Sequence, residues 1–323
     1  MVACNNGHLS VVTYLIDKGA FMDLQCNNGI TALHGAVEKG HLKIVHELLA
    51  LGASQSLANN QGLTPLLYAC NLCSIEMVEH IINRPECTKE QRIDALELLG
   101  AAIANDDECR DTEKAFSYIK RGMEMRYEDP AHPLLKKKME LVEAYQNRKE
   151  SETLEELALL EGNDHAIGME GLIIRERILG PDNLATLPNI AYRAFVLCES
   201  EKHDLCISLL LRGLEKTMNI NVVTITTECL EILIILFRRM VQESILLSPN
   251  YIEDTFEKLV APSEKRTEKL KSKNSQEEQT LYCALCLLMI HTKVKGQNAN
   301  MTDFLQRFLR LNPRTMMEIL YYT

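Results

Sequence analysis

The sequence predicts an all-α chain in which a repeat solenoid is followed by a second array of helices. The first observation is a period of 33 residues in the N-terminal part, where Gly7-His8 recurs as Gly40-His41 and Gly19-Ala20 recurs as Gly52-Ala53. The second is that apolar residues keep helical spacing after this period stops at about Thr88. The third is that hardly any stretch alternates between apolar and polar residues as a half-buried strand does.

A period of 33 residues with these signatures is typical of ankyrin repeats. Each unit carries G-x-T-[AP]-L, then G-H-L-x-x-V and L-x-x-x-G-A, which predicts a turn and two antiparallel helices. Pro65 suits the first turn of an inner helix, and Gly19 and Gly52 stand where an outer helix ends in left-handed backbone. Pro85 replaces the third such glycine and predicts the end of the solenoid. Because units bury their apolar faces by stacking, the array exposes a concave surface that we expect to bind proteins.

The array starts within a unit. Met1 falls in the same column as His34, so the first turn and the first residues of an inner helix are missing. A solenoid needs a polar capping repeat at its end. Either the chain is a fragment of a longer protein, with further repeats upstream, or its first helix packs poorly; we expect the fragment.

The composition argues against several classes of function. The 323 residues carry a net charge of −10, whereas a nucleic-acid-binding surface needs a basic stripe. No apolar run approaches the roughly 18 residues that cross a bilayer, and the N-terminus carries no signal sequence, so neither nucleic acid nor membrane is an expected partner. The 11 cysteines lie mostly in apolar helical patterns and are expected to be reduced thiols, which places the protein in the cytosol or the nucleus.

The second half of the chain predicts helices of another kind. Thr88-Lys89-Glu90-Gln91 is a capping box, and Gly180-Pro181 ends a helix that carries Met169 and Ile173. Leu135, Met139 and Val142 also keep helical spacing. A stretch rich in lysine, glutamate and serine is too polar to repay the entropy of ordering. The predicted organisation is ankyrin repeats over 1–87, a helical domain over 88–260 with helices at 190–198, 205–214 and 222–241, an exposed charged loop over 261–279, and C-terminal helices over 280–323.

Two motifs in the helical domain resemble a known family. Residues 169–183, MEGLIIRERILGPDN, look like the end of a tetratricopeptide unit of the kinesin-light-chain type. Joined to ankyrin repeats and to IDALELLG at residues 93–100, they resemble the fem-one (feminization) homologues. Further matches are Tyr192-Arg193-Ala194, Cys206-Ile207 and residues 311–315. The resemblance implies a tetratricopeptide-like fold for residues 88–260.

The fem-one homologues are substrate receptors of cullin-2 RING ubiquitin ligases, so the resemblance implies a non-catalytic binding subunit. Their amino-terminal ankyrin repeats bind C-terminal peptides of substrate proteins, which often end in arginine. A box near their C-terminus docks elongin B/C and cullin-2. Neither this box nor the early repeats that form most of the pocket are present in the sequence, so both functions are expected to need more chain. The alternative is a non-ligase adaptor that binds motor or signalling proteins.

Other patterns have simpler explanations. Cys70-x-x-Cys73 and Cys283-x-x-Cys286 have the spacing of zinc ligands. Because the cysteines lie in apolar helical columns, where a free thiol acts as a small hydrophobe, core packing is predicted in place of a metalloenzyme site. Residues 65–70 fit the start of an elongin-docking box, but Ser74 stands where such a box needs an apolar side chain, and the ankyrin column already explains every residue.

Charged and histidine motifs are also interpreted as structural. Asp106-Asp107-Glu108 is interpreted as a capping loop before the helix start at Asp111, and Lys136-Lys137-Lys138 as a solvated helix face. His8 and His41 are expected to tie a turn to its neighbour. The sequence holds no glycine-rich phosphate loop, no G-x-S-x-G and no H-E-x-x-H run, so it predicts no enzyme, no cofactor and no metal.

The binding surface is predicted on the concave face and turn tips of the ankyrin repeats. These positions lie in columns that the solenoid does not need for packing, so they are available to a partner. The candidates are Asn5, Asn6, Gln25, Asn27, Asn28, Glu38, Lys39, Tyr68 and Asn71. In the family an aromatic residue often stands in the Asn5 column, so peptides ending in arginine are expected to bind weakly.

Overall fold

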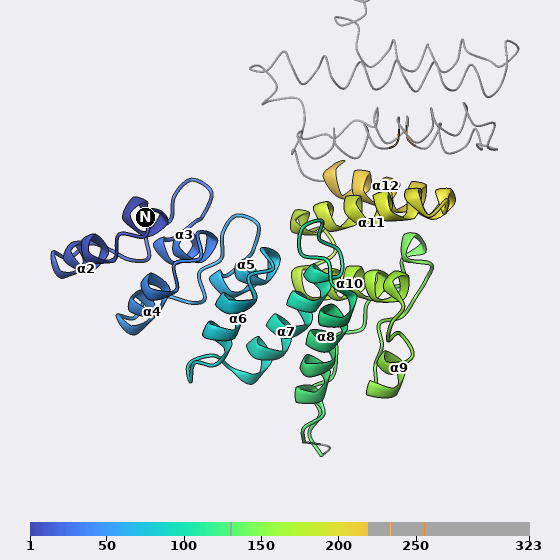
Figure 1. The fold of residues 1–323 in the computed structure, drawn as a ribbon, viewed down its shortest axis with the longest axis horizontal. Helices are drawn as coiled ribbons and strands as arrows, with labels where there is room; N and C mark the ends of the chain where they lie inside the picture. The colour runs from blue at the N-terminus through green and yellow to red at the C-terminus, as the bar shows by residue number, and fades with distance from the viewer. Residues whose placement is uncertain (130, 219–232, 234–254, 256–323) are drawn as a thin grey trace, which may run out of the picture. The chain divides into compact units, whose positions relative to one another are not determined.

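The computed structural model describes residues 1–129 and 131–218, together with Leu233 and Thr255. This part of the chain holds helices and no strand, which confirms the all-α prediction (Figure 1). The helices belong to two compact units, Met1–Tyr192 and Arg193–Thr323. In chain order they are α1 (Val2–Asn5), α2 (Leu9–Asp17), α3 (Ala32–Glu38), α4 (Leu42–Ala50), α5 (Pro65–Asn71), α6 (Ile75–Ile82), α7 (Lys89–Ile103), α8 (Thr112–Arg126), η1 (Glu143–Tyr145), α9 (Leu154–Ala158), α10 (Asp164–Leu179), η2 (Leu184–Thr186), α11 (Leu187–Glu199) and α12 (His203–Met218).

Three predicted segments lie outside the described residues: the helix at 222–241, the loop at 261–279 and the helices at 280–323. Among the helices that are described, none is both long and apolar enough to cross a bilayer.

The ankyrin part consists of three helix pairs, α1 with α2, α3 with α4 and α5 with α6 (Figure 1). Threonine caps start the inner helices of the second and third pairs. The hydroxyl of Thr31 accepts a hydrogen bond from the N–H of His34, and that of Thr64 accepts one from the N–H of Leu67. Each cap satisfies a backbone N–H that the helix itself leaves unpaired, which explains why the helices begin where the repeat predicts.

The repeat columns are confirmed in packing and in backbone conformation. Val12, Val45 and Val78, each one period apart, are all buried. Gly19 and Gly52 follow the outer helices with φ angles of 83° and 90°. This left-handed region costs glycine nothing, because glycine has no Cβ.

In one of the three units, the turn between the inner and outer helices has another residue where the other two units have glycine. Gly7 and Gly40 have φ angles of 76° and 71°, and Cys73 takes the same position in the third unit with a φ of 51°. A left-handed conformation costs a residue with a side chain roughly 1–2 kcal/mol. The third unit therefore keeps the ankyrin backbone while placing a buried thiol in the turn.

Helix α7 joins the ankyrin units to the helices that follow. It starts at the predicted capping box, in which the hydroxyl of Thr88 accepts from the N–H of Gln91 (3.2 Å) and Gln91 Oε1 accepts from the N–H of Thr88 (3.0 Å). It packs against α5 and α6 on one side and against α8 and α10 on the other, so one hydrophobic core runs through both arrays. The core is therefore continuous across the predicted boundary after residue 87, and the compact unit extends to Tyr192.

The two motifs that carry the family resemblance face each other in this core. Glu97 on α7 is fully buried, and its carboxylate accepts hydrogen bonds from Nε (2.7 Å) and Nη2 (2.9 Å) of Arg126 on α8. Arg177 on α10 donates to the same carboxylate and to Glu150 Oε2 (2.7 Å). Asp94 adds a half-exposed carboxylate beside both arginines. Buried charges persist because each has partners of opposite sign.

Glycines allow α7 and α8 to pack closely. A Cβ at Gly100 would lie 2.6 Å from the carbonyl oxygen of Ala115, and one at Gly122 would lie 2.6 Å from Cγ of Glu97. Real carbon atoms do not approach this closely, so both positions require the absence of a side chain.

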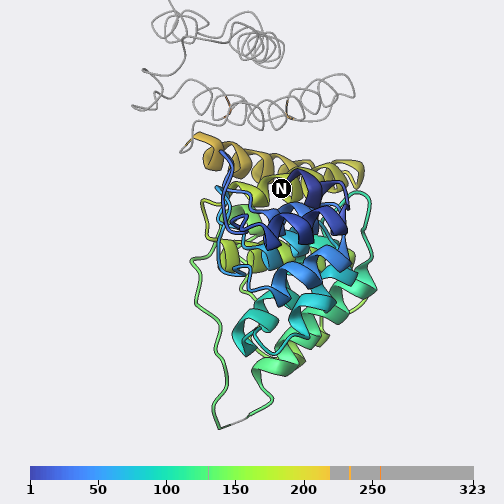
Figure 2. The ribbon, with the colours of Figure 1, turned by 90° about the vertical axis from the view of Figure 1, so that its left-hand side faces the viewer.

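The segment between α8 and α9 is not the helix that its spacing predicts. Leu135, Met139 and Val142 are spaced as on a helix, yet residues 133–142 form an irregular strap that leads into η1 (Figure 2). Helical spacing stabilises a helix when a neighbouring surface buries the apolar face. That condition fails here, because Leu135 is 75% exposed.

Lys136 tethers the strap. Its ammonium donates to the carbonyl of Ser151 (2.8 Å) and pairs with Glu150 Oε1 (2.8 Å). The prediction of a solvated helix face for Lys136-Lys137-Lys138 was therefore wrong in two respects: the segment is no helix, and the side chain of Lys136 is 6% exposed.

Helices α11 and α12 confirm the predicted helices at 190–198 and 205–214. A short turn joins them, in which Glu201 has a φ of 58°. Cys206, Ile207 and Leu210 on α12 are fully buried. The tetratricopeptide-like assignment of this region stays a prediction.

Candidate protein-binding surface

The inner helices α3 and α5 bring three predicted residues together, here called the Glu38 cluster: Glu38, Lys39 and Tyr68. The hydroxyl of Tyr68 donates to Glu38 Oε2 (3.3 Å), and the ammonium of Lys39 pairs with Glu38 Oε1 (2.7 Å). Burial raises the pKa of Tyr68, and the charge of Glu38 raises this pKa further, so the phenol stays protonated. The cluster presents a carboxylate, an ammonium and a hydroxyl at one place on the ankyrin surface.

His34 supports this cluster from within the solenoid. Its ring lies edge-on to Tyr68, with centroids 5.8 Å apart. The N–H of Thr31 points at Nδ1 (3.3 Å), so Nδ1 is the acceptor and Nε2 donates to the carbonyl of Leu63 (3.0 Å). Burial lowers the pKa of His34, although the hydrogen bond to Leu63 opposes this shift. The imidazole is therefore a neutral link between two ankyrin units.

Asn5 is held against the neighbouring unit. Its backbone carbonyl accepts a hydrogen bond from Nε2 of His41 (3.0 Å), which confirms the tie predicted for His41. Its side-chain oxygen occupies the space that a Cβ at Gly35 would need. Asn6, which follows α1, is exposed.

The turn tips connect successive units. Gln25 Nε2 donates to the carbonyl of Ala58 (2.8 Å), and Asn60 Nδ2 donates to the carbonyl of Asn27 (2.8 Å). The N–H of Asn60 donates to the carbonyl of Asn28 (3.0 Å). Gln25 thus has a structural role of its own, whereas Asn27 and Asn28 contribute backbone carbonyls to these contacts and are exposed.

Asn71 contacts a residue that the sequence did not single out. Arg175 on α10 is fully buried, and its Nη2 donates to Asn71 Oδ1 and to the carbonyl of Ala185 (2.6 Å). Its Nε and Nη1 have no hydrogen-bond partner, and burial lowers the pKa of Arg175 to about 10. The contact orients the carboxamide of Asn71 at the end of α5. Because the two residues are 104 positions apart, no local pattern signals it.

A small group of possible metal ligands lies near Arg175. Atoms of Cys73, Asp106 and Cys109 lie within 4.8 Å of one another. Asp106 Oδ1 already accepts hydrogen bonds from the N–H groups of Glu108 (3.0 Å) and Cys109 (2.9 Å), so this carboxylate orders the loop, while Asp111 caps α8. Burial raises the pKa of Cys73 to about 12, so this thiol is protonated at neutral pH. The nearby guanidinium of Arg175 opposes a cation at this place.

Cys70 is a core residue. It is fully buried, and its thiol donates to the carbonyl of Ala95 (3.3 Å). Burial raises the pKa of Cys70 far above its ordinary value. The other cysteine pair of the zinc hypothesis, Cys283 and Cys286, lies outside the described residues.

The chain is similar in sequence to known proteins. Residues 1–92 match a family model described as ankyrin repeats, in three copies. Protein fem-1 homolog C of Xenopus laevis is 38% identical over 144 residues, which are 44% of this chain and 23% of that protein. Protein fem-1 homolog A of Danio rerio is 39% identical over 135 residues, 41% of this chain and 22% of that protein. Protein fem-1 homolog A-like of Mus musculus is 30% identical over 256 residues, 68% of this chain and 39% of that protein.

Proposed function

Since the chain belongs to the family of the fem-1 homologues, we propose that it is the substrate-recognition part of a cullin-2 RING ubiquitin ligase. It is a protein-interaction scaffold built from ankyrin repeats and further helices. The chain matches only 22% to 39% of the length of these relatives. We therefore assign the docking of elongin B/C and cullin-2 to the regions of these relatives that lie outside the matched residues. Peptide capture is assigned to the ankyrin surface of this chain.

The observation that supports peptide capture is the Glu38 cluster. A C-terminal arginine carries a guanidinium and a carboxylate in one residue. Glu38 offers the carboxylate that a guanidinium pairs with in bidentate fashion, and Lys39 offers an ammonium for the terminal carboxylate. The side chains of Lys39 and Glu38 are 49% and 35% exposed, so their mutual pair is worth little and yields readily to a ligand.

The proposal is tested by fluorescence anisotropy with a labelled peptide that ends in arginine. We expect a dissociation constant no better than roughly 100 μM, or about −5.5 kcal/mol. Glu38→Gln should weaken this binding further, while Glu124→Gln, a matched change on the exposed face of α8, should not. A peptide with an amidated C-terminus should bind less well, because Lys39 then has no partner.

One result would count against this assignment, and another would count against the expected need for further repeats. Equal binding of the free-acid and amidated peptides would mean that the terminus is not recognised. Low-micromolar binding that is lost in Asn5→Ala and Glu38→Ala would show that the three ankyrin units suffice by themselves, contrary to the expected need for further repeats.

The ligase role needs a separate test. A chain extended to the length of the relatives should recover elongin B/C and cullin-2 from a lysate. Recovery of motor or signalling proteins without cullin-2 would instead favour the adaptor function.

A further inference from the structure

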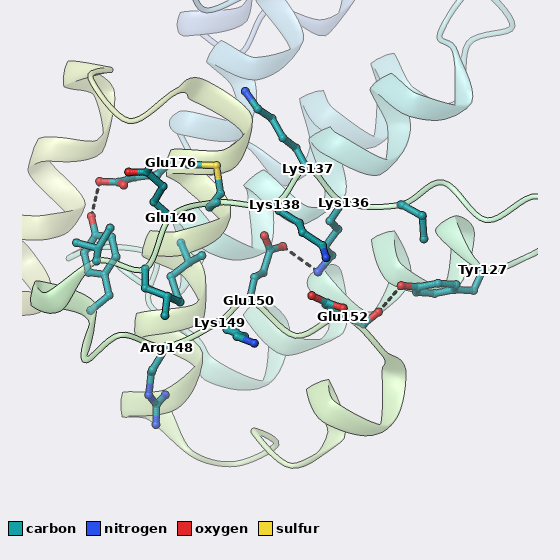
Figure 3. A pocket seen from close by; sticks show the side chains of 16 residues that line it. Tyr127, Lys136, Lys137, Lys138, Glu140, Arg148, Lys149, Glu150, Glu152 and Glu176 are labelled. Carbon is teal, nitrogen blue, oxygen red and sulfur yellow. Dashed lines mark hydrogen bonds and ion pairs between the residues drawn. The ribbon is translucent and has the colours of Figure 1, made fainter.

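The strap lines an open cavity away from the ankyrin surface. Residues 135–142, Tyr145, residues 148–150 and Glu152, together with Tyr127 and with Ile173 and Glu176 of α10, line a space of about 260 Å³ (Figure 3). This volume is below the range of about 300–1,000 Å³ that holds a cofactor or a drug-sized ligand. It suits one or two side chains of a peptide.

The walls of the cavity are held in place by buried polar contacts. The hydroxyl of Tyr145 donates to Glu176 Oε1 (2.7 Å), which joins two lining residues. Ser151, between the lining residues Glu150 and Glu152, donates its N–H to Glu170 Oε1 (2.7 Å). The Lys136–Glu150 pair fixes the other side of the strap (Figure 3). A partner would thus meet a largely pre-formed site, which reduces the ordering cost of binding.

Some apolar side chains at the cavity are exposed to solvent. Leu135 and Leu141 line it and are 75% and 52% exposed. Met139, Val142 and Ile173 contribute further apolar surface. Exposed leucines beside a cavity offer hydrophobic area that a docked aliphatic side chain would cover.

The strap, together with η1 and the turn that follows it, carries a charge opposite to that of the chain. Residues 134–149 carry five lysines and arginines and two glutamates, in a chain of net charge −10. Lys136 pairs with Glu150, whereas Lys137, Lys138, Arg148 and Lys149 form no ion pair within the described part of the chain.

The four unpaired cations surround the cavity. In the view of Figure 3, Lys137 and Arg148 lie at its two ends, with Lys138 and Lys149 between them. Glu140 and Glu152 also line the cavity, so four unpaired cations stand beside these two carboxylates. The mixture is not the uniformly basic surface that a nucleic acid requires.

We propose that this cavity docks an acidic peptide segment of a partner protein, with one or two leucine-like side chains entering the cavity and flanking carboxylates pairing with Lys138 and Lys149. The aliphatic side chains cover Leu141 and its neighbours, and the carboxylates select against basic or neutral segments. The site is separate from the Glu38 cluster, so the inference stands independently of the proposed function.

The probe is a fluorescein-labelled peptide of about ten residues, in which aspartate and glutamate flank two leucines. Anisotropy should show saturable binding that weakens as salt rises from about 50 mM to about 300 mM. The double variant Lys138→Glu/Lys149→Glu should weaken binding by about tenfold or more. Lys43→Glu/Lys120→Glu, the same charge change at two exposed lysines on α4 and α8, should have no comparable effect.

The apolar part is tested by Leu141→Ser and by a peptide with both leucines replaced by serine, each of which should weaken binding severalfold. Because Lys138, Lys149 and Leu141 are exposed, these variants are expected to fold, and unchanged circular dichroism is the control. Glu38→Gln should leave this binding unaffected.

Several outcomes would overturn the inference. These are no saturable binding up to about 500 μM, equal losses in the two double variants, or equal affinity for the leucine-free peptide. Tighter binding of a single-stranded oligonucleotide than of the peptide would also overturn it, and would assign the cations to a nucleic acid.

Discussion

Replacing Glu97 by glutamine is expected to lower the free energy of unfolding by about 3–5 kcal/mol. Glu97 is fully buried, and both arginines that donate to it, Arg126 and Arg177, have side chains 7% and 5% exposed. The amide keeps the shape of the carboxylate but not its charge. The cluster would then hold three cations, with Lys136 the third, against two carboxylates.

Urea unfolding followed by far-UV circular dichroism measures this loss. With a denaturant slope of about 2 kcal/mol/M, the unfolding midpoint should fall by roughly 1.5–2.5 M. Glu124→Gln on the exposed face of α8 is the matched control, with an expected change within about 0.5 kcal/mol. A loss below about 1 kcal/mol for Glu97→Gln would mean that the cluster behaves like a surface ion pair, and would refute the reasoning.

The pH dependence gives a second readout of the same side chain. Burial by itself raises the pKa of Glu97, but the hydrogen bond from Arg126 and the charge of Arg177 outweigh burial and hold this pKa below its ordinary value. The contribution of Glu97 is therefore present above the unfolded pKa of about 4.3 and is lost as the pH falls through the lower folded pKa. The deficit of Glu97→Gln relative to the wild type should shrink in this acidic range.

Three other perturbations have defined outcomes. Burial lowers the pKa of His34, so wild-type stability should decline as the pH falls below about 6.5, and His34→Gln should flatten this part of a thermal-unfolding pH profile. Gly100→Ala should lower stability in urea titrations by about 1–3 kcal/mol, because the new Cβ meets the backbone oxygen of Ala115. An equally stable Gly100→Ala protein would show that α7 and α8 separate easily. Thr88→Ala should cost about 1 kcal/mol by removing the cap of α7, and a loss of helical circular dichroism without a stability change would contradict this.

Features that depend on residues close in sequence could be predicted correctly. The capping box at Thr88, the start of α8 after Asp111 and the left-handed glycines at Gly19 and Gly52 all arise within one helical turn. The period of 33 also placed Glu38 and Tyr68 in adjacent units, because stacked repeats contact mainly their neighbours. The sequence therefore determined the ankyrin part and the location of the Glu38 cluster.

The strap shows where such reasoning fails. Spacing at Leu135, Met139 and Val142 is compatible with a helix, but spacing alone does not say whether a surface exists to bury those side chains. The deciding contacts of Lys136 are made to Glu150 and Ser151, on the far side of η1. Periodicity could not show that Lys136 would tie the segment to Glu150 and Ser151, or that the segment would line a cavity beside α10.

Only the tertiary structure decided which distant residues meet. Arg177 reaches Glu97 across 80 positions, and Arg175 reaches Asn71 across 104. Both contacts arise because α10 packs on α7, next to the last ankyrin unit. Sequence alone established that the two motifs are distinctive, but their chemistry as buried ion pairs required the packing, since the energy of a buried charge depends on the partners that the fold brings to it.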